Sequence, residues 1–113
     1  MYAVIFEVHP KPEGKQEYLD IAGELRADLE TADGFISIER FESLTNEEKM
    51  LSLSYWRDEA AIKSWRERVN HRQAQAKGRT ELFNGYRIRV AQVVRDYTME
   101  DRSEALQPPP EDS

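Results

Sequence analysis

Two side chains on one predicted helix are of the types that could carry out proton chemistry on a flat organic ligand. Trp65 offers a large aromatic face, and His71 offers an imidazole whose ordinary pKa lies near neutrality. An imidazole there can act as a general base or donate a hydrogen bond to a bound oxyanion. The plainer alternatives, a core tryptophan and a surface histidine at a helix end, stay open.

The spacing of this pair places a condition on the helix. Six residues of a straight α-helix turn through about 240°, so Trp65 and His71 share a pocket only if the helix bends or breaks between them. Asn70, Gly78 and a loosened apolar pattern favour such a break. Asn70 and Arg79 are also candidates to steady a developing anion in the pocket.

A third candidate for proton transfer is Glu7, which interrupts an apolar run over residues 2–8. One interpretation is a strand-end carboxylate that reaches solvent or an arginine such as Arg87. In the other, Glu7 points toward the helices, where desolvation would raise its pKa and make it a usable base.

The elements that must position these residues alternate in the order β-α-β-β-α-β. The sequence predicts strands over 2–8, 35–43, 50–56 and 86–97, one helix over 14–32, and a second helix capped by Asp58. This is the order of a ferredoxin-like α+β domain with an antiparallel sheet. We place that domain at 1–98, followed by an acidic, proline-rich tail at 99–113.

Apolar residues occupy both faces of the predicted sheet. One face of the strand over 50–56 carries Leu51, Leu53 and Tyr55, and the other face carries Met50 and Trp56. In the first strand, Ile5 lies on the face opposite the main apolar row. Two helices cover only one face, so the second apolar face needs another cover. A second copy of the sheet is the simplest cover, and we expect a homodimer whose sheets pack face to face.

Composition argues against several classes of function. The net charge of -6 opposes an electrostatic grip on nucleic acid, although a basic cluster, which we assign mainly to a solvated helix face, runs from Arg66 to Arg79. The absence of cysteine excludes a disulfide, a thiolate nucleophile and a Cys-ligated metal. Two histidines without metal-ligand spacing argue against zinc and non-haem iron, so we expect no metal and no other cofactor.

Targeting signals are not visible in the chain. The first apolar run is short, contains Glu7 and follows no basic region, which is unlike a signal peptide. No apolar run approaches the ~20 residues that span a bilayer. We therefore expect a cytoplasmic protein with no membrane partner.

A family resemblance follows from the second helix and its flanks. The matching residues are Tyr55, Trp56, Ala60, Trp65, His71, Arg72, Ala74, Gln75, Gly78, Arg79, Phe83, Tyr86 and Arg87, with a weaker match at Pro12–Lys15 and at Gly34 and Phe35. In these the chain resembles the antibiotic biosynthesis monooxygenase superfamily, whose members form dimeric α+β barrels. The resemblance covers residues 1–97 and leaves out the tail.

The resemblance implies a cofactor-independent monooxygenase acting on a small aromatic substrate such as a quinol, a phenol or an anthrone. Trp65 would form the pocket wall, with Phe83 and Tyr55 beside it, and His71 or Glu7 would take the proton. The alternatives are a non-catalytic dimer that binds a small ligand or a protein, and a haem-binding or haem-degrading protein.

The haem alternative can be tested by correspondence. Haem-degrading members resemble one another in an asparagine on the first strand, the tryptophan of the second helix, and an iron-ligating histidine about three turns later. In this chain Glu7, Trp65 and Gln75 stand at those positions, so only the tryptophan is retained. His71 lies one turn before Gln75, which leaves a shifted ligand open.

Overall fold

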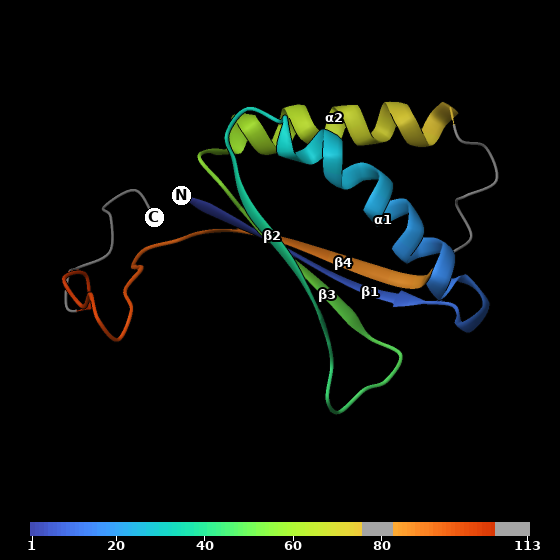
Figure 1. Ribbon diagram of the computed structural model, residues 1–113, viewed down its shortest axis with the longest axis horizontal. Coiled ribbons are helices and arrows are strands. Elements are labelled where there is room, and N and C mark those ends of the chain that lie inside the picture. Colours follow the sequence, from blue (N-terminus) through green and yellow to red (C-terminus); the bar gives the residue numbers. More distant parts are fainter. Residues whose placement is uncertain (76–82, 106–113) are drawn as a thin grey trace.

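The computed structural model describes residues 1–75 and 83–105, and within them the side chains of 1–71 and 85–105. A four-stranded antiparallel sheet with the order β2-β3-β1-β4 carries helices α1 and α2 on one face (Figure 1). The elements are β1 (Tyr2–Pro10), the short 3₁₀ turn η1 (Pro12–Gly14), α1 (Lys15–Glu30), β2 (Phe35–Glu42), β3 (Met50–Trp56), α2 (Glu59–Gln75) and β4 (Phe83–Gln92). The predicted ferredoxin-like α+β class is confirmed.

The last strand differs from its predicted range of 86–97. β4 begins at Phe83, opposite Pro10, and ends at Gln92, opposite Tyr2. Among the described strands its only neighbour is β1, which begins at Tyr2, so the residues after Gln92 have no described strand beside them. The amide of Val93 still donates to the carbonyl of Met1 at 3.0 Å.

The start of α2 is fixed on two sides. The Oδ1 atom of Asp58 accepts a hydrogen bond from the amide of Ala61 at 2.8 Å, which confirms the predicted helix cap and lowers the pKa of the Asp58 carboxyl. Gly34, in the turn between α1 and β2, has a φ of 83°, and a Cβ there would lie 2.6 Å from the Cβ of Ala61. Only glycine allows that turn to lie so close to α2.

Two apolar clusters fill the layer between the helices and the sheet. One contains Val8, Tyr18 and Met50, and the other contains Leu29, Trp56, Ala61 and Ile62, with Trp65 packed against it. Trp56 is only 2% exposed, and its indole Nε1 donates to the hydroxyl of Ser54 at 2.9 Å. This bond satisfies the one polar atom of the indole inside the core.

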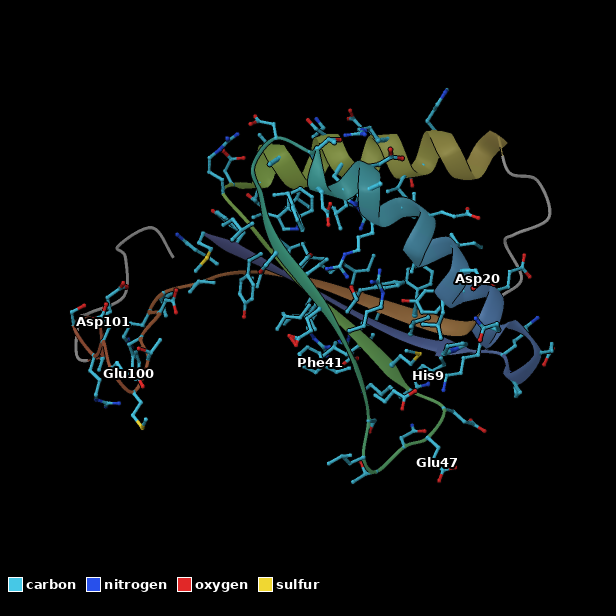
Figure 2. All side chains as sticks on the ribbon, in the orientation of Figure 1. His9, Asp20, Phe41, Glu47, Glu100 and Asp101 are labelled. Atoms are coloured by element: carbon cyan, nitrogen blue, oxygen red, sulfur yellow. The ribbon has the colours of Figure 1, made fainter. Side chains whose placement is uncertain are left out.

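The other face of the sheet has no cover among the described residues. Leu51, Leu53 and Tyr55 lie there half-buried, beside Ile5 of β1. Phe41 of β2, paired with Leu51, is 43% exposed, and Figure 2 shows it on the side opposite the helices. The apolar character of both faces is therefore as predicted.

The chain leaves the sheet after β4 and extends away from it (Figure 1). A local turn follows, in which the amide of Thr98 donates to the carbonyl of Asp101 at 2.8 Å and Arg102 lies over the ring of Tyr97. Residues 106–113 of the predicted tail lie outside the described residues. No helix in the described part is long and apolar enough to cross a membrane.

Candidate functional site

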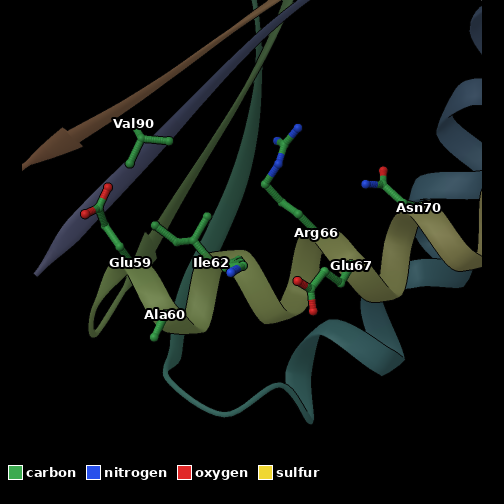
Figure 3. Close-up of a pocket in the computed structure, with 8 residues that line it drawn as sticks. Glu59, Ala60, Ile62, Arg66, Glu67, Asn70 and Val90 are labelled. Atoms are coloured by element: carbon green, nitrogen blue, oxygen red, sulfur yellow. The ribbon is translucent and has the colours of Figure 1, made fainter.

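Hollows lie on both sides of α2. The first, which we call the α1–α2 groove, has a volume of about 540 Å³. It is lined by Leu25, Asp28, Ser64, Trp65, Glu67, Arg68, Val69 and His71. The second, which we call the α2–β4 trough, has a volume of about 520 Å³ and is lined by Glu59, Ala60, Ile62, Lys63, Arg66, Glu67, Asn70 and Val90 (Figure 3). Both hollows are open to solvent, and both volumes fall within the range of about 300–1,000 Å³ found for small-molecule sites.

The α1–α2 groove brings Trp65 and His71 together without a break in the helix. α2 runs continuously from Glu59 to Gln75, so the expected break between the two residues is wrong. The two side chains can share the groove because a separation of about 240° in one direction around the helix is a separation of only about 120° in the other direction. Two long side chains separated by that angle can line one groove when a second helix, here α1, closes it.

The indole of Trp65 is held on two sides. Its ring centroid lies 6.4 Å from that of Trp56, with the planes inclined at 34°. The guanidinium carbon of Arg68 lies 5.3 Å from the centroid of the Trp65 ring, within the range of a cation–π contact. The tryptophan thus joins the core to the groove, and the exposed side chain of Arg68 lies over its ring.

The groove combines apolar and ionisable groups. Leu25 and Val69 contribute aliphatic walls, Asp28 and Glu67 contribute carboxylates, and His71 contributes an exposed imidazole. Such a set can hold a flat organic molecule and exchange a proton with it. No group of three or more histidine, cysteine or acidic side chains that could hold a metal ion occurs among the described residues.

Asn70 lies on the other side of α2 from the groove. It lines the trough, where Figure 3 shows Ile62, Arg66 and Asn70 projecting from the side of α2 that faces Val90 of β4. Five residues separate Asn70 from Trp65, which is about 140° around the helix. The predicted substrate-binding residues Trp65 and Asn70 therefore line different hollows.

Glu7 lines neither hollow, and of its two interpretations the one with a raised pKa is contradicted. It lies on the sheet face away from the helices, where its carboxylate is 3.3 Å from Lys49 and 3.3 Å from Arg89. The hydrogen bond from Lys49 is the main reason why the pKa of Glu7 is lowered rather than raised. The interpretation as an ion-paired carboxylate is confirmed, with Arg89 rather than Arg87 as the arginine.

Tyr55, expected beside Trp65, lies on the opposite face of the sheet. Trp56 takes the inward position of β3, so its neighbour Tyr55 must point outward. Phe83 is placed by its backbone as the first residue of β4, and its side chain lies outside the described part. Arg79 lies wholly outside the described residues.

Sequence reasoning missed Arg66 and Arg68 as residues of the hollows. Both were assigned to a solvated helix face, whereas Arg66 lines the trough and Arg68 lies over Trp65. A signal for Arg66 was present, because Ile62, Arg66 and Asn70 recur at every fourth position and must form one row along a helix.

The chain is similar to known proteins at the level of sequence and of fold. The family model described as antibiotic biosynthesis monooxygenase matches residues 1–77. The chain is 46% identical over 93 residues to the jasmonate monooxygenase ABM of Pyricularia oryzae, which covers 82% of this chain. The same alignment covers 43% of the fungal protein, so this chain spans less than half of that relative's length.

Two solved structures share the fold at low identity. The cofactor-independent oxygenase SnoaB from Streptomyces nogalater superposes with a TM-score of 0.69 at 9% identity, covering 84% of this chain and 94% of that one. The heme-degrader MhuD from Mycobacterium tuberculosis superposes with a TM-score of 0.66 at 17% identity, covering 87% and 100%. At these identities the likeness extends to the fold alone.

Proposed function

Because the chain belongs to the antibiotic biosynthesis monooxygenase family, we propose that it is a monooxygenase of a small organic substrate that uses neither a bound metal nor a flavin. Its reaction would consume one O₂ for each CH₂ group of an anthrone, or for each reacting ring C–H of a phenol or quinol, which is a CH₂ group in the keto tautomer. The substrate loses a proton, the resulting carbanion reduces O₂, and a C–O bond forms as a peroxide. Loss of water then leaves a carbonyl. Substrate carbon is the reductant, so the protein supplies only a base, an oxyanion donor and a dry pocket.

The observation that carries this proposal is the joint position of Trp65 and His71 in the α1–α2 groove. In it, a flat quinol, phenol or anthrone lies against the indole after Arg68 moves aside, and the imidazole of His71 takes the proton. A histidine suits this role because it can both accept and return a proton near neutral pH. Leu25 and Val69 exclude water from one side of the ligand.

A second substrate class is a small carboxylate with a non-aromatic body. The 46% identity to a protein named jasmonate monooxygenase favours it, since jasmonate is the anion of a carboxylic acid. Because the alignment covers only 43% of that relative, its substrate is carried over here only as a candidate to be tested beside the aromatic ones.

The deciding experiment is oxygen uptake by the purified, metal-free chain. The panel contains a hydroquinone, an anthrone and jasmonate, with uncatalysed oxidation subtracted and Trp65→Phe as the paired variant. Uptake that saturates with one substrate and falls in the variant supports the proposal. If no substrate gives uptake above background, the chain is better regarded as a ligand-binding or interaction dimer.

Haem binding is the weaker alternative. Its support is the shared fold with a haem-degrading protein at 17% identity, and Glu7 and Gln75 are not the residue types that those enzymes use. Titration with hemin distinguishes the two. A Soret shift that saturates at one or two haems per chain would favour haem binding over the cofactor-independent reaction.

The open face of the sheet supports a homodimer. An apolar strip on this face is formed by Ile5, Leu51, Leu53 and Tyr55, and none of the described elements covers it. A second copy of the chain is the cover we propose. Leu53→Glu should dissociate the dimer, because it places a carboxylate at the centre of the strip. Light scattering measures this, with the exposed Ile36→Glu on β2 as a control; a wild-type monomer at micromolar concentration would overturn the dimer.

A further inference from the structure

The α2–β4 trough has a chemical polarity along its length. Ile62, Arg66 and Asn70 form one row on α2, and this row faces Val90 across the trough (Figure 3). The row therefore runs from an aliphatic side chain through a cation to a carboxamide. This sequence of groups matches a ligand that has an apolar body and a charged end.

The cations of the trough have no counter-ion among the described residues. Neither Arg66 nor Lys63 lies within 4.0 Å of a described carboxylate, whereas Arg57 binds both Asp33 and Asp58. Glu59 lies at the far end of the trough, seven residues from Arg66, which is about 10 Å along the helix axis. An anion is thus favoured beside Arg66 and disfavoured at the Glu59 end.

Glu67 also lines the trough and must be weighed against the cations. In Figure 3 its carboxylate projects away from the side of α2 that carries Arg66 and Asn70, and it lines the α1–α2 groove as well. The charge that faces β4 in the middle of the trough is therefore positive.

The apolar part of the trough is equally well placed. Ile62 is a buried member of the core cluster and presents its remaining surface to the trough. Val90 is 44% exposed on the helix-facing side of β4, next to Val4 of β1. An exposed valine beside a hollow of this size is suited to contact with an apolar ligand.

We infer that the trough binds a small organic carboxylate, with the carboxylate at Arg66 and Asn70 and the apolar body along Ile62 and Val90. A guanidinium binds a carboxylate through two parallel hydrogen bonds, and a carboxamide N–H adds a third. The site lies across α2 from the groove in which we place the oxygenase reaction, so it stands or falls independently of that reaction.

The test is an NMR titration of the full chain with octanoate, followed through the backbone amides. Saturable shifts are expected at Ile62, Arg66, Asn70 and Val90. Arg66→Met should raise the dissociation constant about 10-fold or more, because it removes a charge-assisted pair. Arg68→Met is the matched control, since it removes an arginine two residues away that lies over Trp65 instead.

One further ligand and one further variant separate charge from apolar contact. Octanol should bind the wild type more weakly than octanoate does, because it cannot pair with the guanidinium. For the same reason, Arg66→Met should bind octanol as strongly as the wild type does. Arg66→Lys should bind octanoate with intermediate strength, since an ammonium keeps the charge and loses the two-pronged geometry.

Three results would overturn the inference. They are the absence of saturable shifts at millimolar octanoate, shifts confined to the groove residues Trp65 and His71, and equal weakening by Arg66→Met and Arg68→Met. The last result would mean that any positive charge on α2 attracts the anion. Because the readout is binding, a failure of the oxygen-uptake experiment does not affect it.

Discussion

Trp56 and Trp65 lie with their ring centroids 6.4 Å apart, so the wall of the candidate groove is also the edge of the core. Trp56 is fixed by its burial and by the bond from its Nε1 to Ser54. The orientation of Trp65 therefore depends on a residue of β3 that lines neither hollow. Changes at Ser54 or Trp56 are expected to reach the groove through this contact.

Ser54→Ala should lower the free energy of unfolding by about 1–3 kcal/mol, because it leaves the buried Nε1–H of Trp56 without an acceptor. Urea unfolding followed by tryptophan fluorescence measures the change. The matched control is Ser52→Ala, a buried serine on the same strand and the same face whose hydroxyl makes no hydrogen bond with a described residue. Equal losses in both variants would mean that the bond to Trp56 contributes nothing.

His71→Ala should reduce turnover by about 10²-fold if its imidazole is the general base. The substrate is the one that gives saturable oxygen uptake. The variant should fold like the wild type, because the side chain of His71 is an exposed part of the groove lining. His71→Gln keeps a hydrogen-bonding group and removes the base. Wild-type turnover in both variants would reject His71, and full activity in His71→Gln alone would reduce its role to hydrogen bonding.

Glu7→Gln should change how stability depends on pH. The hydrogen bond and charge of Lys49, together with Arg89, lower the pKa of Glu7 below its ordinary value of 4.5. A lowered pKa means that the ion pairs stabilise the fold above about pH 4.5 and that this contribution is lost as the pH falls through the folded-state value. The wild type should exceed Glu7→Gln in stability near neutrality, and the difference should shrink in acid.

Denaturant melts of both proteins across about pH 6 to pH 3, at one protein concentration, measure that difference. Glu47→Gln, in the turn between β2 and β3, is the control, because its carboxylate makes no ion pair with a described residue (Figure 2). A difference that stays constant or grows as the pH falls would contradict the assignment of the ion pairs to Glu7.

Arg40→Met should stabilise the protein by about 1 kcal/mol. Arg40 lies opposite Ser52 on the helix-facing side of β2, and its Nε is buried without a hydrogen-bond partner among the residues that the structure describes. The nearest acid along that side of the strand, Glu42, is bound to Lys15 of α1 at 2.9 Å. Replacing a poorly satisfied guanidinium by an apolar side chain of similar length removes a desolvation cost.

Thermal unfolding checks this gain, with Arg26→Met as the control, because Arg26 is exposed and paired with Glu30 on α1. A loss of stability in Arg40→Met comparable to that of a core cavity would show that Arg40 is satisfied in solution. Such a loss would mean that the aliphatic stem and the charge of Arg40 both stabilise the layer between the sheet and the helices.

Local patterns in the sequence were sufficient for much of the fold. The alternation in residues 50–56 placed Trp56 inward and Leu51, Leu53 and Tyr55 outward, because the two-residue period of a strand is a local property. The side chain of Asp58 caps α2 through its own backbone neighbourhood. The end of β4 was not predictable in this way, since it depends on where its partner β1 begins.

The candidate site was determined only by the tertiary structure. The sequence by itself supplied Trp65, His71 and Asn70 on one helix, together with Glu7 on a strand. Which of them meet depends on the sides of α2 against which α1 and β4 pack, and no local pattern encodes that choice. Packing closed a groove around Trp65 and His71, left Asn70 in the trough, and turned Glu7 toward Lys49 and Arg89 on the other face of the sheet.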